Sequence, residues 1–234
     1  MKILAISDVH DEFEAFAPET LPDADVCLIA GDLTNFGQLE RRRFASLELE
    51  RLLATLAGGS GAGPTHEVVR AKQWLEALAR RYPVFWIPGN HDIGVTAETF
   101  GEIPNCICLL NSLQTFDGFR LYGVSITPCY NAPFLAKQWD YMTADPGVEE
   151  AAFDFESVDI VVSHGPPYGC VDGGMPLLNG ERPRLGSSAL RNYIERYAPK
   201  LVLCGHIHEA NGRDAIGKTQ VVNVACSWRL LELE

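Results

Sequence analysis

The sequence predicts an α/β protein in which helices flank β-sheets of mixed strand direction. Three observations carry this prediction. Segments with helical spacing of apolar residues lie between short apolar runs, which is typical of strand–helix–strand crossovers. Two turn dipeptides lie between further strand-like runs and indicate hairpins. Five apolar runs have the length and continuity of buried strands, and they are residues 3–6, 26–30, 84–87, 160–162 and 201–203.

Two amphipathic helices follow from the periodicity. The first is predicted over residues 65–82, because its apolar side chains fall on one side of a helix: Val68, Val69, Trp74, Leu75 and Leu78. The second is predicted over residues 187–197. Ser187 or Ser188 is a suitable N-cap for it, and Pro199 lies just beyond its end.

Two hairpins are predicted from their turn residues. An Asp-Gly pair at 117–118 and a Gly-Lys pair at 217–218 each separate two strand-like runs. The strands they join are residues 113–116 and 119–126 in the first hairpin, and 214–216 and 219–225 in the second. Cys106 and Cys108 alternate along another predicted strand and are expected to face the core.

One segment stands apart from this pattern. Residues 39–57 have an apolar helical stripe and begin near three consecutive arginines, which are expected to form a solvated face. Residues 58–64 are rich in glycine and suit a flexible return loop. We therefore expect a single domain over residues 1–234 with a helical, glycine-rich insertion at about 37–65.

Composition limits the classes of function. The formal net charge of −12 argues against a surface that binds long nucleic acid, but it allows a small phosphorylated ligand at a locally positive site. The seven cysteines are odd in number and form no C-x-x-C pair, which favours reduced thiols. No signal peptide or membrane span is recognisable, so the expected location is cytoplasmic and no membrane partner is predicted.

Side chains that can bind metal follow each of the five buried strands. Five of the six histidines of the chain lie in these turns, with His66 the exception. Ligands gather at the carboxyl ends of strands in α/β sheets. The candidate residues are Asp8 and His10 after the first strand, Asp32 after the second, Asn90, His91 and Asp92 after the third, His164 after the fourth, and His206 and His208 after the fifth.

The chemistry and number of these groups suit two metal ions. Residues two apart on an extended chain point the same way, so Asp8 with His10, and His206 with His208, can each reach a common centre. Nitrogen and oxygen ligands without a thiolate favour Mn, Fe or Zn. Seven ligands are too many for one ion with an open position, but they suit two ions that share a carboxylate.

In the same order, the five motifs resemble those of the calcineurin-like metallophosphoesterase superfamily. They are D-x-H at 8–10, GD at 31–32, GNHD at 89–92, SH at 163–164 and GHxH at 205–208. The resemblance extends from the first residue to about residue 225. It implies a four-layer α/β/β/α sandwich, with two packed, mostly mixed sheets between helices and a dinuclear metal centre at one edge.

The resemblance also implies a role for each residue. One ion would be held by Asp8, His10, Asp32 and His208, and the other by Asp32, Asn90, His164 and His206, with Asp32 bridging. His91 would lie beside the substrate and protonate the leaving group, with Asp92 orienting its ring. The implied cofactors are two divalent or mixed-valence transition ions (Mn, Fe or Zn). The implied reaction is hydrolysis of a phosphate ester by hydroxide held between them.

A finer resemblance concerns the substrate. The segments SHGPPYG at 163–169 and GHIHE at 205–209 resemble small phosphodiesterases related to the mammalian metallophosphoesterase-domain-containing proteins. This favours nucleotides or other small diesters. The expected substrate contacts are Asn90, His91, Asn131 and Tyr168. The helix start at Ser187 is a further candidate anion site.

The same five motifs are also compatible with other functions. A phosphomonoesterase, including a protein Ser/Thr phosphatase, would use the same metal centre. A non-catalytic scaffold of this fold is less favoured, because the set of metal ligands is complete. A DNA-repair nuclease is disfavoured by the acidic charge.

Overall fold

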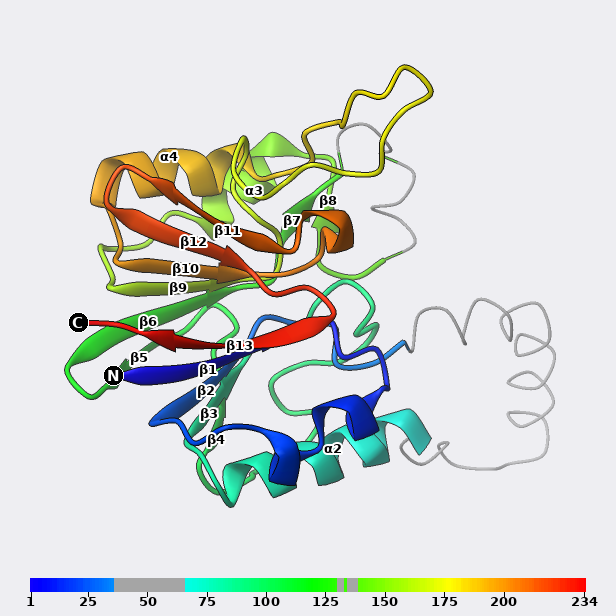
Figure 1. Cartoon of the computed structure of the whole chain (residues 1–234), viewed down its shortest axis with the longest axis vertical. Helices are drawn as coiled ribbons and strands as arrows, with labels where there is room; N and C mark the ends of the chain where they lie inside the picture. Colours follow the sequence, from blue (N-terminus) through cyan, green and yellow to red (C-terminus); the bar gives the residue numbers. More distant parts are fainter. Residues whose placement is uncertain (36–65, 130–132, 134–138) are drawn as a thin grey trace, which may run out of the picture.

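The computed structural model describes residues 1–35, 66–129, 133 and 139–234. Two large β-sheets pack face to face, and helices lie on the outer side of each (Figure 1). The two chain termini lie close together at the end of the sheets opposite the loops that carry the candidate site (Figure 1). This is the four-layer α/β/β/α arrangement that the family resemblance implies.

The first sheet has five strands in the order β13-β1-β2-β3-β4. Strands β1 to β4 are parallel neighbours, and β13 closes the edge antiparallel to β1. The strand bounds are β1 Lys2–Ser7, β2 Val26–Ile29, β3 Val84–Trp86, β4 Cys106–Cys108 and β13 Ser227–Glu232. The parallel direction brings the carboxyl ends of β1, β2 and β3 to one edge.

The second sheet has six strands in the order β11-β12-β10-β9-β6-β5. Its four central strands are parallel, and the two predicted hairpins supply its antiparallel edges. The bounds are β5 Leu113–Phe116, β6 Phe119–Val124, β9 Ile160–Ser163, β10 Leu201–Cys204, β11 Gly212–Ile216 and β12 Thr219–Asn223. A small separate sheet pairs β7 Thr127–Pro128 with β8 Met142–Thr143.

Helices cover both outer faces. Helix α2 (His66–Ala79) packs on the first sheet together with the short 3-10 turns η1 (Phe13–Phe16) and η2 (Pro18–Thr20). On the second sheet lie α3 (Pro146–Ala152) and α4 (Ser188–Tyr197). A further 3-10 turn, η4 (His208–Ala210), follows β10. The hydroxyl of Ser187 accepts the N–H of Leu190 and caps α4, as predicted.

The layering follows from alternation along β1. Ile3 and Ala5 belong to the apolar cluster between the two sheets, whereas Leu4 and Ile6 belong to the cluster beneath α2. Successive residues of a strand point to opposite faces, so a strand that is apolar throughout must be covered on both sides. A third cluster lies between the second sheet and α4, with Leu190 and Tyr193 at its centre.

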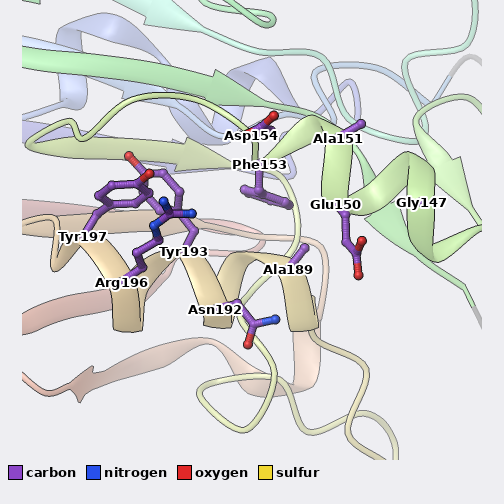
Figure 2. Close-up of a pocket in the computed structure, with 10 residues that line it drawn as sticks. All are labelled: Gly147, Glu150, Ala151, Phe153, Asp154, Ala189, Asn192, Tyr193, Arg196 and Tyr197. Carbon is purple, nitrogen blue, oxygen red and sulfur yellow. The ribbon is translucent and has the colours of Figure 1, made fainter.

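A cavity of about 440 Å³ lies between α3 and α4. Figure 2 shows side chains from both helices along its borders, with Phe153 and Tyr193 contributing aromatic surface. Burial raises the pKa of Tyr193 to about 12, and its hydroxyl donates to the backbone carbonyl of Glu156. None of the predicted site residues lines this cavity.

The two helices predicted over 65–82 and 187–197 and both predicted hairpins are confirmed, whereas β13 and α3 were not predicted. Cys106 and Cys108 are half-buried and pack against the cluster beneath α2. The insertion expected at 37–65 lies outside the described residues, and the single-domain assignment stays a prediction. In the described part of the chain, no helix combines the length and apolar character needed to cross a membrane.

Candidate metal centre

The seven predicted ligands come together at one edge of the molecule, where strands of both sheets end. Their side chains are mostly buried; Asp8, Asp32, Asn90 and His164 are each no more than 4% exposed. The ligands follow β1 (Asp8 and His10), β2 (Asp32), β3 (Asn90), β9 (His164) and β10 (His206 and His208). Burial of so many ionisable groups requires pairing or metal binding.

The first group of donors surrounds Asp8. Nε2 of His208 lies 3.2 Å from Oδ1 of Asp8 and 3.3 Å from Nε2 of His10. Nε2 of His10 also lies 3.9 Å from Oδ2 of Asp32. These four residues are the set that the family resemblance implies for one ion. Two imidazole nitrogens at this separation beside two carboxylates form a favourable arrangement for a cation.

The second group surrounds His164. Its Nε2 lies 2.9 Å from Oδ1 of Asn90 and 3.4 Å from Oδ2 of Asp32, and its ring lies 5.0 Å from that of His206 between centroids. Its Nδ1 donates to the backbone carbonyl of Ala30 at 2.8 Å, so that Nε2 can bind an ion once its own proton is lost. Asp32 therefore lies within 4 Å of a histidine from each group.

The backbone at this edge is unusual. Asp8, His10, Asp32 and His206 have φ between 50° and 68°, in the left-handed region that non-glycine residues rarely adopt. Such conformations persist where the surrounding structure holds them, and they are common at functional sites. Gly205 is required for space, because a Cβ there would overlap the side chains of Ser7 and Asp8.

Without ions, the carboxylates and histidines form mutually stabilising pairs. Burial alone would raise the pKa of Asp8 and of Asp32, but nearby histidines hold both pKa values below their ordinary range. Burial opposes the charge of His164, yet attraction to Asp32 raises its pKa to about 9. The hydrogen bond to Asp8 raises the pKa of His208 to about 10.

The donor set fits metal ions. Three groups of side chains each place their ligand atoms within 4.8 Å of one another: His10, His208 and Cys226; His10, Asp32 and His91; and Asp8, Asp32 and His164. The Nδ1 atoms of His10 and His91 are buried without a hydrogen-bond partner among the described residues. Imidazole nitrogens, carboxylate oxygens and a thiol are all donors that transition metal ions accept. The assignment of each ligand to one ion stays a prediction.

Cys226 is a member of this site that sequence reasoning missed. It is exposed, its φ is 53°, and its Sγ lies 3.3 Å from Nδ1 of His208. The ligands predicted from the sequence include no thiolate, and the structure places the thiol of Cys226 beside one of them. Cys226 lies beyond the carboxyl end of β12, so the strand-end signal that identified the other residues applies to it as well.

Asp92 has a different role from the one expected. Its carboxylate is fully buried and accepts the backbone N–H groups of Leu33, Thr34 and Gly89 at 2.8–3.1 Å. It therefore ties the turn after β2 to the turn after β3, while burial raises its pKa to about 7. Since Nδ1 of His91 is buried without a partner in the described chain, Asp92 does not orient that ring by a hydrogen bond.

The ring of His91 is held by other rings. It lies 4.2 Å from the indole of Trp139 and 4.7 Å from the ring of His10 between centroids. Its backbone N–H donates to Oδ1 of Asp32 at 2.7 Å. Burial lowers the pKa of His91 to about 4 despite the nearby carboxylate of Asp32, so the ring is neutral at pH 7 in the absence of a ligand. A bound phosphate anion would favour its protonated form.

A cavity of about 610 Å³ adjoins this centre. Asn90, His91 and Tyr168, three of the four expected substrate contacts, line it. The fourth, Asn131, lies outside the described residues. The cavity is also lined by Pro128, Cys129, Trp139, Met142, Arg184, Leu185, Gly186, Ser188, His206 and Ile207. Its size is in the range of small-molecule sites.

The anion site expected at the start of α4 is already occupied by protein. A carboxylate oxygen of Glu149 accepts the hydroxyl of Ser187 and the N–H of Ala189, while Ser187 itself accepts the N–H of Leu190. Glu149 is buried and places its own negative charge at the helix N-terminus. This helix start is therefore not available to a second anion.

Comparisons with known proteins identify a family for this chain. A family model described as Calcineurin-like phosphoesterase matches residues 1–210. Metallophosphoesterase domain-containing protein 1 of Homo sapiens is 26% identical over 96% of this chain and 65% of its own length. A UPF0046 protein of Caenorhabditis elegans is 24% identical over 96% of this chain and 69% of its own length. The chain thus spans 65% of the human relative.

Solved structures share the fold. One crystal structure aligns with a TM-score of 0.61 and 19% identity, covering 96% of this chain and 90% of its own. A second, of the protein TT1561 from Thermus thermophilus, aligns with a TM-score of 0.58 and 18% identity, covering 96% and 88%. The predicted fold class is thereby confirmed, and the family model confirms the family resemblance. With its five motifs at the strand ends and a family model over most of its length, this chain belongs to the calcineurin-like phosphoesterase family.

Proposed function

We propose that the protein is a metal-dependent phosphodiesterase that hydrolyses nucleotides or other small diesters at a dinuclear centre. The observation that carries this proposal is the position of Asp32, whose Oδ2 lies 3.4 Å from His164 and 3.9 Å from His10. A carboxylate between two groups of ligands is suited to bridge two ions. When bound, such ions supply an activated water and neutralise charge on phosphate.

The adjoining cavity supports a diester as the substrate. Trp139, Met142 and Ile207 give it apolar surface, and its volume of about 610 Å³ leaves room for a large ester group beside the ligands Asn90 and His206. Apolar walls bind the organic part of an ester, while the centre binds the phosphoryl group. His91 is placed between these two regions, where it can donate a proton to the leaving oxygen.

The expected partner is therefore a small phosphorylated molecule. We also propose a cytoplasmic location and Mn, Fe or Zn as the ions. All seven cysteines are free thiols, and buried thiols are typical of reducing compartments.

The test compares a diester and a monoester with the same leaving group. Protein reconstituted with Mn²⁺, Fe²⁺ or Zn²⁺ is assayed on bis(4-nitrophenyl) phosphate and on 4-nitrophenyl phosphate. We expect a higher kcat/KM for the diester, loss of both activities on chelation, and loss of both in Asp32→Asn. A higher kcat/KM for the monoester with all three metals would favour a phosphomonoesterase. If the metal-loaded protein hydrolyses neither ester, both the phosphodiesterase and the phosphomonoesterase functions are rejected.

A further inference from the structure

The cavity beside the metal centre has an unusual distribution of charge. The described residues that line it include one residue with a permanent charge, Arg184, and no Asp or Glu. The whole chain carries a formal net charge of −12, so a cationic wall without a lining carboxylate is a local feature. A fixed cation in a cleft attracts anionic groups of a ligand.

A buried carboxylate, that of Asp172, holds the side chain of Arg184 in place. Its guanidinium donates to Oδ1 of Asp172 at 2.7 Å, and the carboxylate of Asp172 is fully buried. The other carboxylate oxygen accepts the backbone N–H groups of Gly169 and Gly186 at 2.9 and 3.2 Å. Asp172 therefore fixes the guanidinium relative to the loop that carries Tyr168, and less side-chain entropy is lost when a ligand binds.

The guanidinium retains donors for a ligand. Its side chain is 53% exposed, and in the described part of the chain its hydrogen bond to Asp172 uses one of three nitrogens. A guanidinium has five N–H donors in a planar fork that matches the oxygens of a phosphate. The charge of Asp172 offsets part of the positive charge, but its oxygens are buried and occupied by donors.

Arg184 and the metal ligands reach the cavity from different segments of the chain. Asn90 and His206 mark the wall that adjoins the metal centre, whereas Arg184 comes from the loop before α4. Apolar surface from Trp139 and Met142 contributes to the same cavity. A ligand that fills this cavity can place one charged group at the metals, an apolar or aromatic part against Trp139 and Met142, and a second charged group at Arg184.

We propose that Arg184 binds a second phosphate group of the substrate, so that the enzyme prefers diesters that carry another phosphate on the part of the molecule held in the cavity. This inference rests on the proposed phosphodiesterase function and names its substrate class. Arg184 is a specificity-determining residue in this proposal, since it contacts the substrate away from the bond that is cleaved.

The test uses two esters that differ by one phosphate. They are the 4-nitrophenyl ester of thymidine 5′-phosphate and the same ester with an added 3′-phosphate. For the wild-type protein we expect kcat/KM to be about tenfold higher for the 3′-phosphorylated ester, mainly because KM is lower. A tenfold ratio is at the low end for a charge-assisted hydrogen bond, as suits a half-exposed site. In Arg184→Gln this ratio falls to about one, and in Arg184→Lys it is intermediate.

Arg182→Gln is the matched control. Arg182 lies on the same loop and donates to the backbone carbonyl of Gly174 at 3.2 Å, but it does not line the cavity. The preference for the 3′-phosphorylated ester should survive in this variant. Circular dichroism and metal content of each variant verify that fold and centre are intact.

Two results would overturn the proposal. Equal kcat/KM for the two esters in the wild-type protein would show that no second phosphate is recognised. Equal losses for both esters in Arg184→Gln would show that Arg184 only supports the loop. Calorimetric binding of thymidine 3′,5′-bisphosphate against thymidine 5′-phosphate repeats the comparison without catalysis. Hydrolysis of bis(4-nitrophenyl) phosphate measures the diesterase activity separately. A failure of the proposed second-phosphate site is therefore distinguishable from a failure of the proposed diesterase function.

Discussion

The thiol of Cys226 lies 3.3 Å from Nδ1 of His208, while Nε2 of the same ring lies 3.2 Å from Oδ1 of Asp8. The imidazole is therefore held on both sides. When Nε2 binds an ion, the ring proton resides on Nδ1 and faces the sulfur. A group in this position fixes the tautomer and the direction of the ligand.

Replacing Cys226 by Ala should weaken metal binding by about 10–100-fold at the ion that Asp8, His10 and His208 are expected to hold, because the ring loses its outer partner. Equilibrium dialysis with Mn²⁺, followed by metal analysis, measures the affinity. Cys226→Ser keeps a polar partner and should recover most of it. Cys226 is the one exposed cysteine of the seven, so alkylation of the folded protein should reproduce the Ala phenotype. Unchanged affinity in Cys226→Ala would show that the sulfur does not support the ligand.

Metal binding at pH 7 should release about two protons, one each from His164 and His208. Their pKa values are raised to about 9 and about 10 in the metal-free protein, so both rings carry a proton that an ion must displace. Affinity should accordingly rise with pH until these pKa values are passed. Asp8 and Asp32 contribute no protons, because their pKa values are lowered.

Calorimetric titration with Mn²⁺ in two buffers of different ionisation enthalpy counts these protons. His208→Gln should release about one fewer, since the ring that holds one of them is gone. A binding heat that does not depend on the buffer would contradict the prediction.

His91→Ala should retain both ions and lose about 10²–10⁴-fold in rate on esters with poor, alkoxide-like leaving groups. The loss should be much smaller on a 4-nitrophenyl diester, whose leaving group departs without a proton. Steady-state kinetics on both ester types and metal analysis check this. Equal losses with full metal content would show that His91 positions phosphate, and loss of metal would show that it is a ligand.

Gly205→Ala should abolish metal binding, because the added Cβ would overlap the side chains of Ser7 and Asp8. Gly212→Ala is the matched control, since the nearest atom to its added Cβ, the backbone oxygen of Ala210, lies at an ordinary contact distance of 3.6 Å. Metal content after reconstitution, together with the unfolding temperature, distinguishes a damaged site from a damaged fold. Full metal content in Gly205→Ala would show that the turn adjusts to the methyl group.

Much of this site was predictable from the sequence because buried strands are recognisable from their apolar runs, and the residues that follow parallel strands lie at one edge of a sheet. β1, β2, β3, β9 and β10 each contain a continuous apolar run, which is typical of a buried strand covered on both faces. Parallel neighbours end at the same edge, and polar residues that follow such strands must therefore meet there. Asp8, Asp32 and His164 were predicted as ligands for this reason, before any distance was known.

The tertiary structure decided what depends on contacts between distant segments. The thiol of Cys226 contacts the ring of His208. Asp92 accepts backbone N–H groups from two turns instead of orienting His91. Glu149 binds the helix start at Ser187 that was a candidate anion site. No periodicity in the sequence indicates these contacts, because each of them depends on how turns pack once the sheets have formed. The cationic wall made by Arg184 arises in the same way: a buried carboxylate at Asp172, 12 residues away in the chain, fixes where that charge lies.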